Sequence, residues 1–347
     1  TPDIYRLFQY LCYMKISASI YSDKSRSLKE VILDLVAHQV DLLHVDCNAA
    51  LSVFEDIANI RTWCDLPIDL HIITENPSKY YDLLESNPVE YVTFQVENLK
   101  EPLEIPTSIT GKKGLAIITP TPITAFDPYS DFDFILIMAT IPGQSGGKFD
   151  RLNFSKIRQF RTKYPSKSIH VDGGVNGEVS FILRNMGVSS AVSGSYLFNG
   201  PSIGNALMNL TKREIESTFE IGDFMIPLNE APSFEVADCS TRKILEAVEV
   251  GQMGFALALE HDQQLFGLVS SADIRKTFLK NLENTRDIDP KNFINRQPMC
   301  VQDTATVIEL LHILKKSNFP VMYLPVVNDK GQAVGIINFV NLIKGEL

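Results

Sequence analysis

Residues 15–46 read KISASIYSDKSRSLKEVILDLVAHQVDLLHVD, and this stretch decides the fold of the first half of the chain. Lys15–Ile20 and Leu42–Asp46 are short apolar runs that predict strands, whereas Ser27–His38 has the spacing of an amphipathic helix. Two strands joined by a helix run parallel, because an antiparallel pair needs only a short turn. The stretch therefore predicts one strand–helix–strand unit of a parallel sheet.

The same alternation continues to residue 212. Six further strands are expected at Ile68–Ile72, Tyr91–Gln95, Lys113–Ile117, Phe134–Met138, Ser168–Asp172 and Ser190–Gly194. Each is followed by a loop and a helical stretch, such as Asn153–Tyr164. Eight units in about 200 residues predict closure into a (β/α)₈ barrel, the α/β TIM-barrel fold.

The pattern changes after Thr211, and residues 224–347 contain two copies of a second pattern. Each copy has a helix, a strand, a tight turn and a second strand that leads into polar residues. The copies end in Phe266–Ile274 and Val334–Ile343, and the repeat is about 60 residues long. Such a repeat predicts a pseudo-symmetric α+β pair that shares a buried face.

A chain of 347 residues is long enough for two domains with separate cores. The expected boundaries are an N-terminal extension at 1–13, a barrel domain at 14–215 and a repeat domain at 216–347, with copies at about 218–282 and 288–347. The extension carries no basic region or cleavage site of a signal peptide. It predicts either a short leading helix or residues upstream of the native start.

Charge and cysteine content exclude several classes of protein. A formal charge of -10 argues against nucleic acid or an anionic membrane as the main partner, because both require clustered Lys and Arg. No run approaches the ~18 consecutive apolar residues of a membrane span. The five cysteines form no C-x-x-C pair, which indicates reduced thiols. These features predict a cytoplasmic globular protein.

Four polar residues are expected at the carboxyl ends of three barrel strands, where side chains converge on one site. His44 and Asp46 share the inward face of the second strand, since alternate residues of a strand point the same way. His71 ends the third strand and Asp172 the seventh. A lone strand histidine is more often a core residue. Two imidazoles with two carboxylates instead suit Zn²⁺, Mn²⁺, Fe²⁺ or Co²⁺, and the carboxylates are costly to bury without a cation.

Glycine-rich segments follow the last three strands and predict a phosphate site. The expected contacts are Gly143, Gly146 and Gly147 after the sixth strand, Gly173 and Gly174 after the seventh, and Gly194 and Ser195 after the eighth. Barrels commonly hold a phosphate with backbone N–H groups in these loops. A tight turn explains any single glycine, but glycines in three adjacent loops favour an anion.

A cation, two carboxylates and a phosphate anchor point to proton transfer next to a carbonyl group. The cation stabilises the negative charge of an ene-diolate, one aspartate removes a proton, and the other returns one to the opposite face. This chemistry inverts a stereocentre. The expected substrate is a phosphorylated ketose.

The first half of the chain resembles the ribulose-phosphate 3-epimerase family over residues 14–210. The motifs that carry the resemblance are Ile16–Ile20, Leu43–Asp46, Asp69–His71, Gly114–Ala116, Pro142–Gly143 with Gly146–Gly147, Val171–Asn176 and Ser193–Ser195. The resemblance implies interconversion of D-ribulose 5-phosphate and D-xylulose 5-phosphate in the pentose phosphate pathway. The implied roles are an acid/base pair at Asp46 and Asp172, metal ligation by both and by His44 and His71, and substrate contacts from Ser19, His71 and Met138.

The chain departs from that family's pattern at several positions. Asn48 and Ile73 replace methionines, and Gln95 replaces the histidine of a Thr-Phe-His pattern. The loop after Asp46 looks shortened, and one extra residue precedes Gly146. No metal ligand or proton carrier is lost. The departures leave the sugar open, and a ketohexose 6-phosphate is an alternative substrate.

Residues 224–347 resemble a tandem CBS-domain module, a family that binds adenine nucleotides. Gly267–Ile274 matches the family's Gly-h-h-Ser/Thr-x-x-Asp-h pattern, in which the hydroxyl meets a phosphate and the carboxylate meets the ribose. The resemblance implies nucleotide contacts from Ser270 and Asp273. Asn338 and Asn341 take these places in the second copy, so we expect at most one good nucleotide site.

A sensor of sugar phosphates or nucleotides, whose barrel has lost catalysis, is a function of a different class. The four retained ligand-type residues argue against it, since a disused metal site should lose its ligands first. By analogy with both families we expect a homo-oligomer.

Overall fold

The computed structural model describes residues 14–140, 146–211, 219–317 and 321–339. The chain divides into two compact units, Thr1–Ile215 with Asn341–Leu347 and Glu216–Val340. The extension expected at 1–13, Gly143 and Asn341 lie outside the described residues. No helix among the described residues combines the length and apolar character needed to cross a bilayer.

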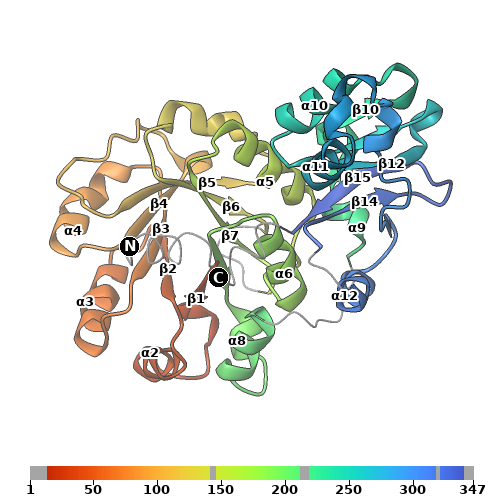
Figure 1. Cartoon of the computed structure of the whole chain (residues 1–347). Coiled ribbons are helices and arrows are strands. Elements are labelled where there is room, and N and C mark those ends of the chain that lie inside the picture. The colour runs from red at the N-terminus through yellow and green to blue at the C-terminus, as the bar shows by residue number, and fades with distance from the viewer. Residues whose placement is uncertain (1–13, 141–145, 212–218, 318–320, 340–347) are drawn as a thin grey trace. The chain divides into compact units, whose positions relative to one another are not determined.

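The first unit is a closed barrel of eight parallel strands in chain order (Figure 1). The strands are β1 (Lys15–Ser19), β2 (Leu42–Asn48), β3 (Ile68–Ile73), β4 (Tyr91–Gln95), β5 (Lys112–Ile118), β6 (Phe134–Met138), β7 (Ser168–Asp172) and β8 (Ser190–Ser193). Strand β1 pairs with both β2 and β8, which closes the barrel. The predicted (β/α)₈ fold is confirmed.

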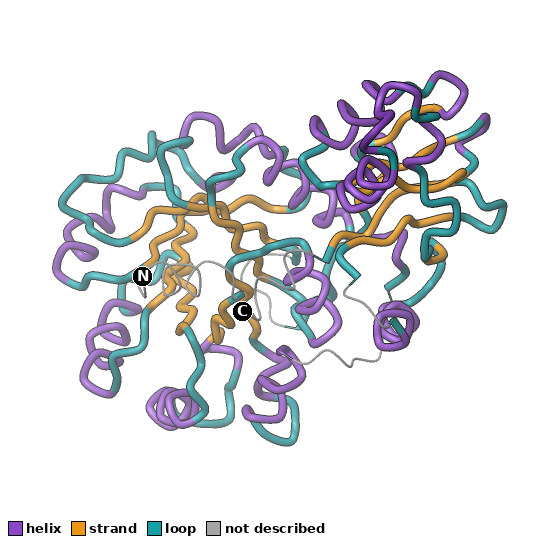
Figure 2. The backbone as a smooth tube through the Cα atoms, in the orientation of Figure 1, coloured by secondary structure: helices purple, strands orange, loops and turns teal. Residues whose placement is uncertain are grey.

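The α-helices of this unit lie outside the strands (Figure 2). They are α2 (Leu28–Ala37), α3 (Val53–Trp63), α4 (Tyr81–Ser86), α5 (Leu152–Lys163), α6 (Gly177–Asn185), α7 (Ser195–Phe198) and α8 (Ile203–Thr211). Ser27 and Glu30 form a capping box that starts α2, whose buried side chains include Val31, Ile32 and Leu35. This packing is that of the predicted amphipathic helix.

The prediction of a helix after every strand was wrong for β4 and β5. The segments that follow these strands contain only the 3₁₀ turns η3 (Val96–Asn98) and η4 (Ile123–Tyr129). The first link carries Pro102 and Pro106, and the second carries Pro120, Pro122 and Pro128. Proline lacks a backbone N–H and its ring clashes with the preceding turn, so these links cannot form regular helices.

The barrel strands bury both apolar and polar side chains. Phe134, Leu136 and Met138 are alternate residues of β6, and they pack with Ala116 of β5 in one buried cluster. Buried polar residues come from several strands and include Ser17, His44, Asp69, His71, Thr93, Gln95, His170, Ser190 and Ser193. The functional groups described below gather at the carboxyl ends of the strands.

The second unit contains two small sheets with the same topology. One sheet has the order β10 (Ser233–Glu235), β11 (Phe255–Leu259) and β12 (Leu265–Ser270), and the other β13 (Val301–Gln302), β14 (Tyr323–Val327), β15 (Ala333–Asn338) and β9 (Ile226–Pro227). In each sheet the first strand pairs parallel with the second, which pairs antiparallel with the third. The register shifts at equivalent places, Ala258/Leu259 and Val326/Val327. The predicted internal repeat is confirmed.

The two sheets share a buried face. The Phe255 ring stacks on the Tyr323 ring with centroids 3.9 Å apart, and Leu257 and Leu268 pack in one cluster with Ile336. The helices of this unit are α9 (Ile221–Phe224), α10 (Thr241–Val250), α11 (Ser271–Lys280) and α12 (Val307–Lys316).

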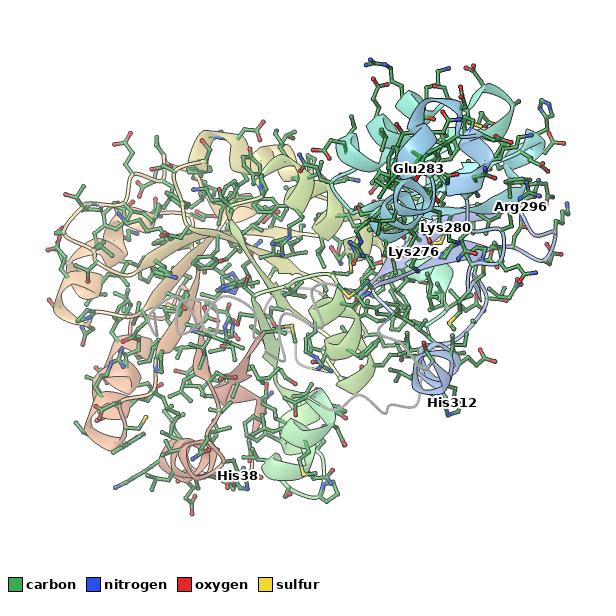
Figure 3. All side chains as sticks on the ribbon, viewed as in Figure 1. His38, Lys276, Lys280, Glu283, Arg296 and His312 are labelled. Atoms are coloured by element: carbon green, nitrogen blue, oxygen red, sulfur yellow. The ribbon has the colours of Figure 1, made fainter. Side chains whose placement is uncertain are left out.

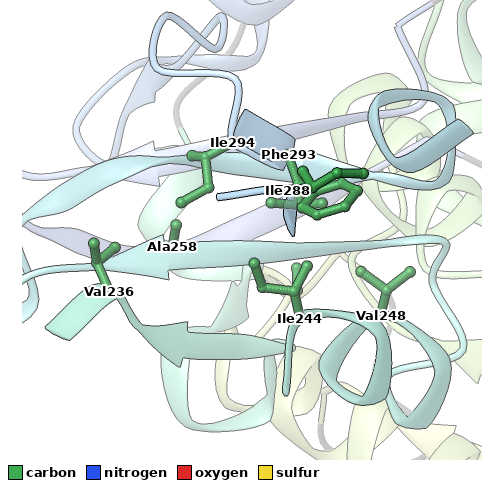
Figure 4. Close-up of a cluster of buried hydrophobic side chains, with 9 residues drawn as sticks. Val236, Ile244, Val248, Ala258, Ile288, Phe293 and Ile294 are labelled. Carbon is green, nitrogen blue, oxygen red and sulfur yellow. The ribbon is translucent and has the colours of Figure 1, made fainter. Parts of the chain in front are cut away.

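A second cluster of buried side chains lies on the first sheet and α10. It includes Ile244 and Val248 of α10 and Phe293 (Figure 4). Helix α11 packs Phe278 against this cluster and leaves Lys276 and Lys280 exposed (Figure 3). The amphipathic character of α10 and α11 thus follows from packing on one sheet.

Candidate metal and substrate site

Four side chains meet at the carboxyl ends of β2, β3 and β7. His44, Asp46, His71 and Asp172 each offer one ligand atom, and these atoms all lie within 4.8 Å of one another. Both histidines are fully buried, while the Asp46 and Asp172 side chains are 21% and 18% exposed. The structure thus brings together the quartet that the sequence marks as metal ligands, with its carboxylates open to a ligand.

A buried carboxylate holds the His44 ring from behind. His44 Nδ1 lies 3.0 Å from Asp69 Oδ2, which also accepts a hydrogen bond from Ser17 Oγ at 3.0 Å. His44 Nε2 lies 3.3 Å from Asp46 Oδ1 and 3.8 Å from Asp172 Oδ2. A carboxylate on one ring nitrogen leaves the other to face a metal, an arrangement found in many metal sites. Sequence reasoning missed this role of Asp69.

Burial and charge push the pKa values of the two aspartates apart. Burial, together with the neighbouring Asp46 carboxylate, raises the pKa of Asp172 to about 6, although His44 acts to lower it. Burial also acts to raise the pKa of Asp46, but His44 and His71 outweigh it and hold that pKa well below its usual range. Two carboxylates of unequal proton affinity side by side are typical of an acid and a base at one reacting centre.

The donor set fits a divalent cation. Two nitrogens and two carboxylate oxygens are the ligands of Zn²⁺ and related first-row ions. His71 Nδ1 is buried, makes no hydrogen bond, and lies 3.4 Å from Asp46 Oδ1. A buried nitrogen without a well-formed hydrogen bond costs free energy unless a ligand takes its lone pair. A cation at this point would satisfy it and neutralise the carboxylates.

Glycines after β6 and β7 converge beside this cluster. Gly173 and Gly174 have φ of 109° and 66°, a region that favours glycine. A Cβ on Gly174 would lie 2.2 Å from the Phe149 backbone nitrogen. Gly147 and Gly173 both face Thr140, with Cβ distances of 2.7 and 2.3 Å to its side chain. Gly146, at φ 86°, lies on the same loop. Gly147, Gly173 and Gly174 therefore let the backbone of these two loops pack closely together. Sequence reasoning missed Thr140 as the residue that Gly147 and Gly173 both contact.

The predicted contacts on the other side of the cluster come from β1, β6 and β8. Ser19 Oγ accepts a hydrogen bond from Ser22 Oγ at 3.1 Å, and a Cβ on Gly194 would lie 2.2 Å from Ser22 Oγ. Ser195 follows directly as the first residue of α7. Met138 is buried and pairs in register with Asp172. Their contacts with a substrate or phosphate stay a prediction, and Gly143 lies outside the described residues.

One comparison decides the family of this chain. The model of the ribulose-phosphate 3 epimerase family matches residues 15–198, which is more than half of the chain. The chain belongs to this family. A CBS-domain model also matches residues 287–346, the second copy of the internal repeat. The first unit is thus an epimerase barrel, and the resemblance seen in the sequence is confirmed for both halves.

Several curated relatives share the epimerase barrel. The ribulose-phosphate 3-epimerase of Methanocaldococcus jannaschii is 30% identical over 219 residues, covering 59% of this chain and 92% of the relative. The cytoplasmic isoform from Oryza sativa subsp. japonica is 26% identical, covering 57% of this chain and 93% of the relative.

A CBS-pair protein from Arabidopsis thaliana is a solved structure that is 21% identical, covering 37% of this chain and 94% of that one at a TM-score of 0.31.

Ser270 and Asp273 form the amino-terminal cap of α11. Ser270 Oγ accepts a hydrogen bond from the Asp273 N–H at 3.1 Å, and the Ser270 N–H donates to Asp273 Oδ2 at 3.0 Å. In the second copy Asn338 ends β15. The cap accounts for both side chains structurally, so their contact with a nucleotide stays a prediction.

Proposed function

We propose that the barrel is a metal-dependent epimerase acting at C3 of D-ribulose 5-phosphate to give D-xylulose 5-phosphate. The observation that carries this proposal is the quartet His44, Asp46, His71 and Asp172, whose ligand atoms lie within 4.8 Å at the carboxyl ends of an epimerase barrel. A bound Zn²⁺, Mn²⁺, Fe²⁺ or Co²⁺ would supply Lewis-acid stabilisation of negative charge on the substrate oxygens.

The two aspartates carry the proton. Ionised Asp46 takes the proton from C3, the electron pair of the broken C–H bond forms the C2–C3 double bond of an ene-diolate, and the carbonyl electron pair moves onto the C2 oxygen. Protonated Asp172 then gives its proton to C3 from the opposite face: the C2–C3 electron pair forms the new C3–H bond, and the pair on the C2 oxygen forms the carbonyl again. The step leaves Asp46 protonated and Asp172 ionised, which are the states needed for the reverse reaction. Asp172 has the higher pKa of the two aspartates, which supports Asp172 as the one that carries the proton.

The glycine loops supply the phosphate anchor in this proposal. Gly173 and Gly174 follow directly after Asp172, and Gly147 and Gly173 pack closely against the same Thr140 side chain. Backbone N–H groups bind phosphate oxygens without a cationic side chain. A phosphate anchor in the loop that follows Asp172 would hold C3 of a short sugar phosphate in place.

Asn48 favours a second candidate, a ketohexose 6-phosphate. It is exposed at the end of β2, on the same face as Asp46, and pairs in register with Ile73 of β3. Its amide can bond to an additional sugar hydroxyl, which the methionine of the family pattern cannot do.

An assay of both sugar phosphates with metal-replenished protein tests the proposal. We expect turnover of ribulose 5-phosphate, and we expect Asn48→Met to change kcat/KM for it by less than about tenfold, the value of one hydrogen bond. Leu51→Met, in the same exposed loop, is the matched control. Turnover of the ketohexose 6-phosphate alone, with kcat/KM lowered about tenfold by Asn48→Met, would establish the second candidate. The absence of turnover with both sugar phosphates would refute the epimerase proposal.

We also propose that the CBS pair binds one adenine nucleotide at Ser270 and Asp273 and thereby regulates the barrel. The Gly267–Ile274 motif supports this site, together with the start of α11, where backbone N–H groups favour a phosphate. Calorimetry with AMP, ADP and ATP should detect binding, and Asp273→Ala should weaken it at least tenfold.

The control for this variant is Glu309→Ala. Glu309 forms the equivalent capping box of α12 with Thr306, so its loss weakens a helix cap without touching the proposed site. Equal loss of binding in both variants would assign the effect to capping, and the absence of binding in the unmodified chain would end the proposal.

A further inference from the structure

Gln95 contacts the buried side of His71. It is the last residue of β4 and is 1% exposed, and its Oε1 lies 2.9 Å from His71 Nε2. Its Nε2 donates to Glu97 Oε2. Gln95 therefore stands between a carboxylate and a histidine whose other nitrogen faces the candidate metal position.

Glu97 determines which end of the Gln95 amide faces which neighbour. An ionised carboxylate accepts hydrogen bonds and donates none. Glu97 Oε1 accepts from the Ile118 N–H at 2.9 Å and from the Thr121 hydroxyl, so Oε2 remains for Gln95. The amide must turn its NH₂ group to Glu97, and its oxygen then faces His71.

An amide oxygen beside a ring nitrogen requires that nitrogen to carry a proton. His71 Nε2 is therefore the N–H, and in the neutral ring Nδ1 carries the lone pair. That nitrogen makes no hydrogen bond and lies 3.4 Å from Asp46 Oδ1, inside the quartet. The chain of contacts from Glu97 through Gln95 thus selects the one tautomer of His71 that can bind a cation.

We propose that Gln95 is a positioning residue that holds His71 in its Nε2–H tautomer, with Glu97 fixing the orientation of Gln95. The effect on tautomer stands on hydrogen-bond geometry alone, whereas the effect on metal binding rests on the proposed function. His44 is held differently, by the Asp69 carboxylate. Gln95 instead holds the His71 ring with a neutral amide oxygen, which accepts from the ring N–H.

The first test observes the tautomer directly. Long-range ¹H–¹⁵N spectra of the metal-free chain should show neutral His71 protonated at Nε2. Gln95→Leu, close in volume, should shift the ring toward the Nδ1–H tautomer, because no other described residue accepts from Nε2 and Asp46 Oδ1 lies 3.4 Å from Nδ1. An Nδ1–H tautomer in the unmodified chain, or an unchanged tautomer in the variant, would overturn the proposal.

The second test measures Zn²⁺ affinity by competition with a chromophoric chelator. Gln95→Leu should weaken binding about 10- to 100-fold, the usual cost of losing a partner behind a ligand. Thr93→Val is the matched control, since Thr93 is buried in the same strand and its hydroxyl makes no hydrogen bond. It should bind Zn²⁺ as the unmodified chain does.

Variants of Glu97 separate positioning from folding. Glu97 is exposed, so Glu97→Ala should fold. This variant should show part of the loss of Zn²⁺ affinity seen in Gln95→Leu. Glu97→Gln keeps an acceptor for the Gln95 amide and should bind Zn²⁺ as the unmodified chain does. Equal Zn²⁺ affinity in Gln95→Leu and the unmodified chain would overturn the proposal. If the unmodified chain binds no Zn²⁺ but shows the expected tautomer, positioning stands and the metal-dependent function fails.

Discussion

Replacing Asp172 with asparagine is expected to lower kcat/KM at least about 10²-fold and to stabilise the metal-free protein. Asparagine keeps the shape of the side chain but carries no proton to C3, and general acid–base groups of this kind contribute 10²- to 10⁴-fold. The measurements are the coupled epimerase assay and chemical denaturation of the metal-free chain.

The gain in stability follows from the pKa of Asp172. Burial raises it to about 6 from an ordinary value of 3.8, which corresponds to a cost on the order of 3 kcal/mol for the ionised form. Because the folded-state pKa is the higher one, this cost is absent below pH 4, grows between pH 4 and pH 6, and is constant above. The free energy of unfolding of Asp172→Asn minus that of the unmodified chain should rise with pH in that way.

Asp41→Asn is the matched control for this variant. Asp41 also has a pKa raised by burial, and its Oδ2 accepts from the Ile16 N–H at 2.8 Å, at the amino-terminal ends of the strands. It should keep full activity. Activity retained in Asp172→Asn, or lost equally in Asp41→Asn, would contradict the role assigned to Asp172.

Removal of the divalent cation is expected to reduce turnover to background, and Zn²⁺, Mn²⁺ or Co²⁺ should restore it. Cation binding must displace a proton from His44. Burial alone would lower the pKa of His44, but the Asp46 and Asp69 carboxylates outweigh it and raise that pKa well above 6.5. Protons therefore compete with the cation, and its affinity should fall as the pH is lowered from 8 to 5.

Calorimetric titration of the metal-free chain with Zn²⁺ at pH 7, in buffers of different ionisation enthalpy, measures the protons released. We expect about one proton, released from His44. Full activity after exhaustive chelation, or metal binding without proton release, would contradict this account of the site.

The sequence was sufficient for the barrel and for the quartet. Eight short apolar runs separated by loops and helices have few other arrangements, and a parallel barrel brings all carboxyl ends to one face. Residues such as His44 and Asp172, far apart in the chain, could therefore be placed together without coordinates.

The partners behind the histidines could not be predicted in this way. Asp69 contacts His44 across 25 residues through the pairing of β2 with β3, and the role of Gln95 depends on the orientation of one amide. These contacts depend on register and rotamer rather than on periodicity. The absent helices after β4 and β5 had a local signal, the prolines of both links, which the alternation of strands outweighed.

The close contacts of Gly147, Gly173 and Gly174 mean that the loops after β6 and β7 tolerate fewer substitutions than the loop after β2. A methyl group added to any of these glycines would lie under 3.0 Å from another atom, so substitutions at these three positions are strongly restricted. Asn48, Ala50 and Leu51 are exposed and can accept many side chains. New sugar preferences in descendants of this barrel would therefore arise at the end of β2, while the phosphate end of the substrate is inherited unchanged.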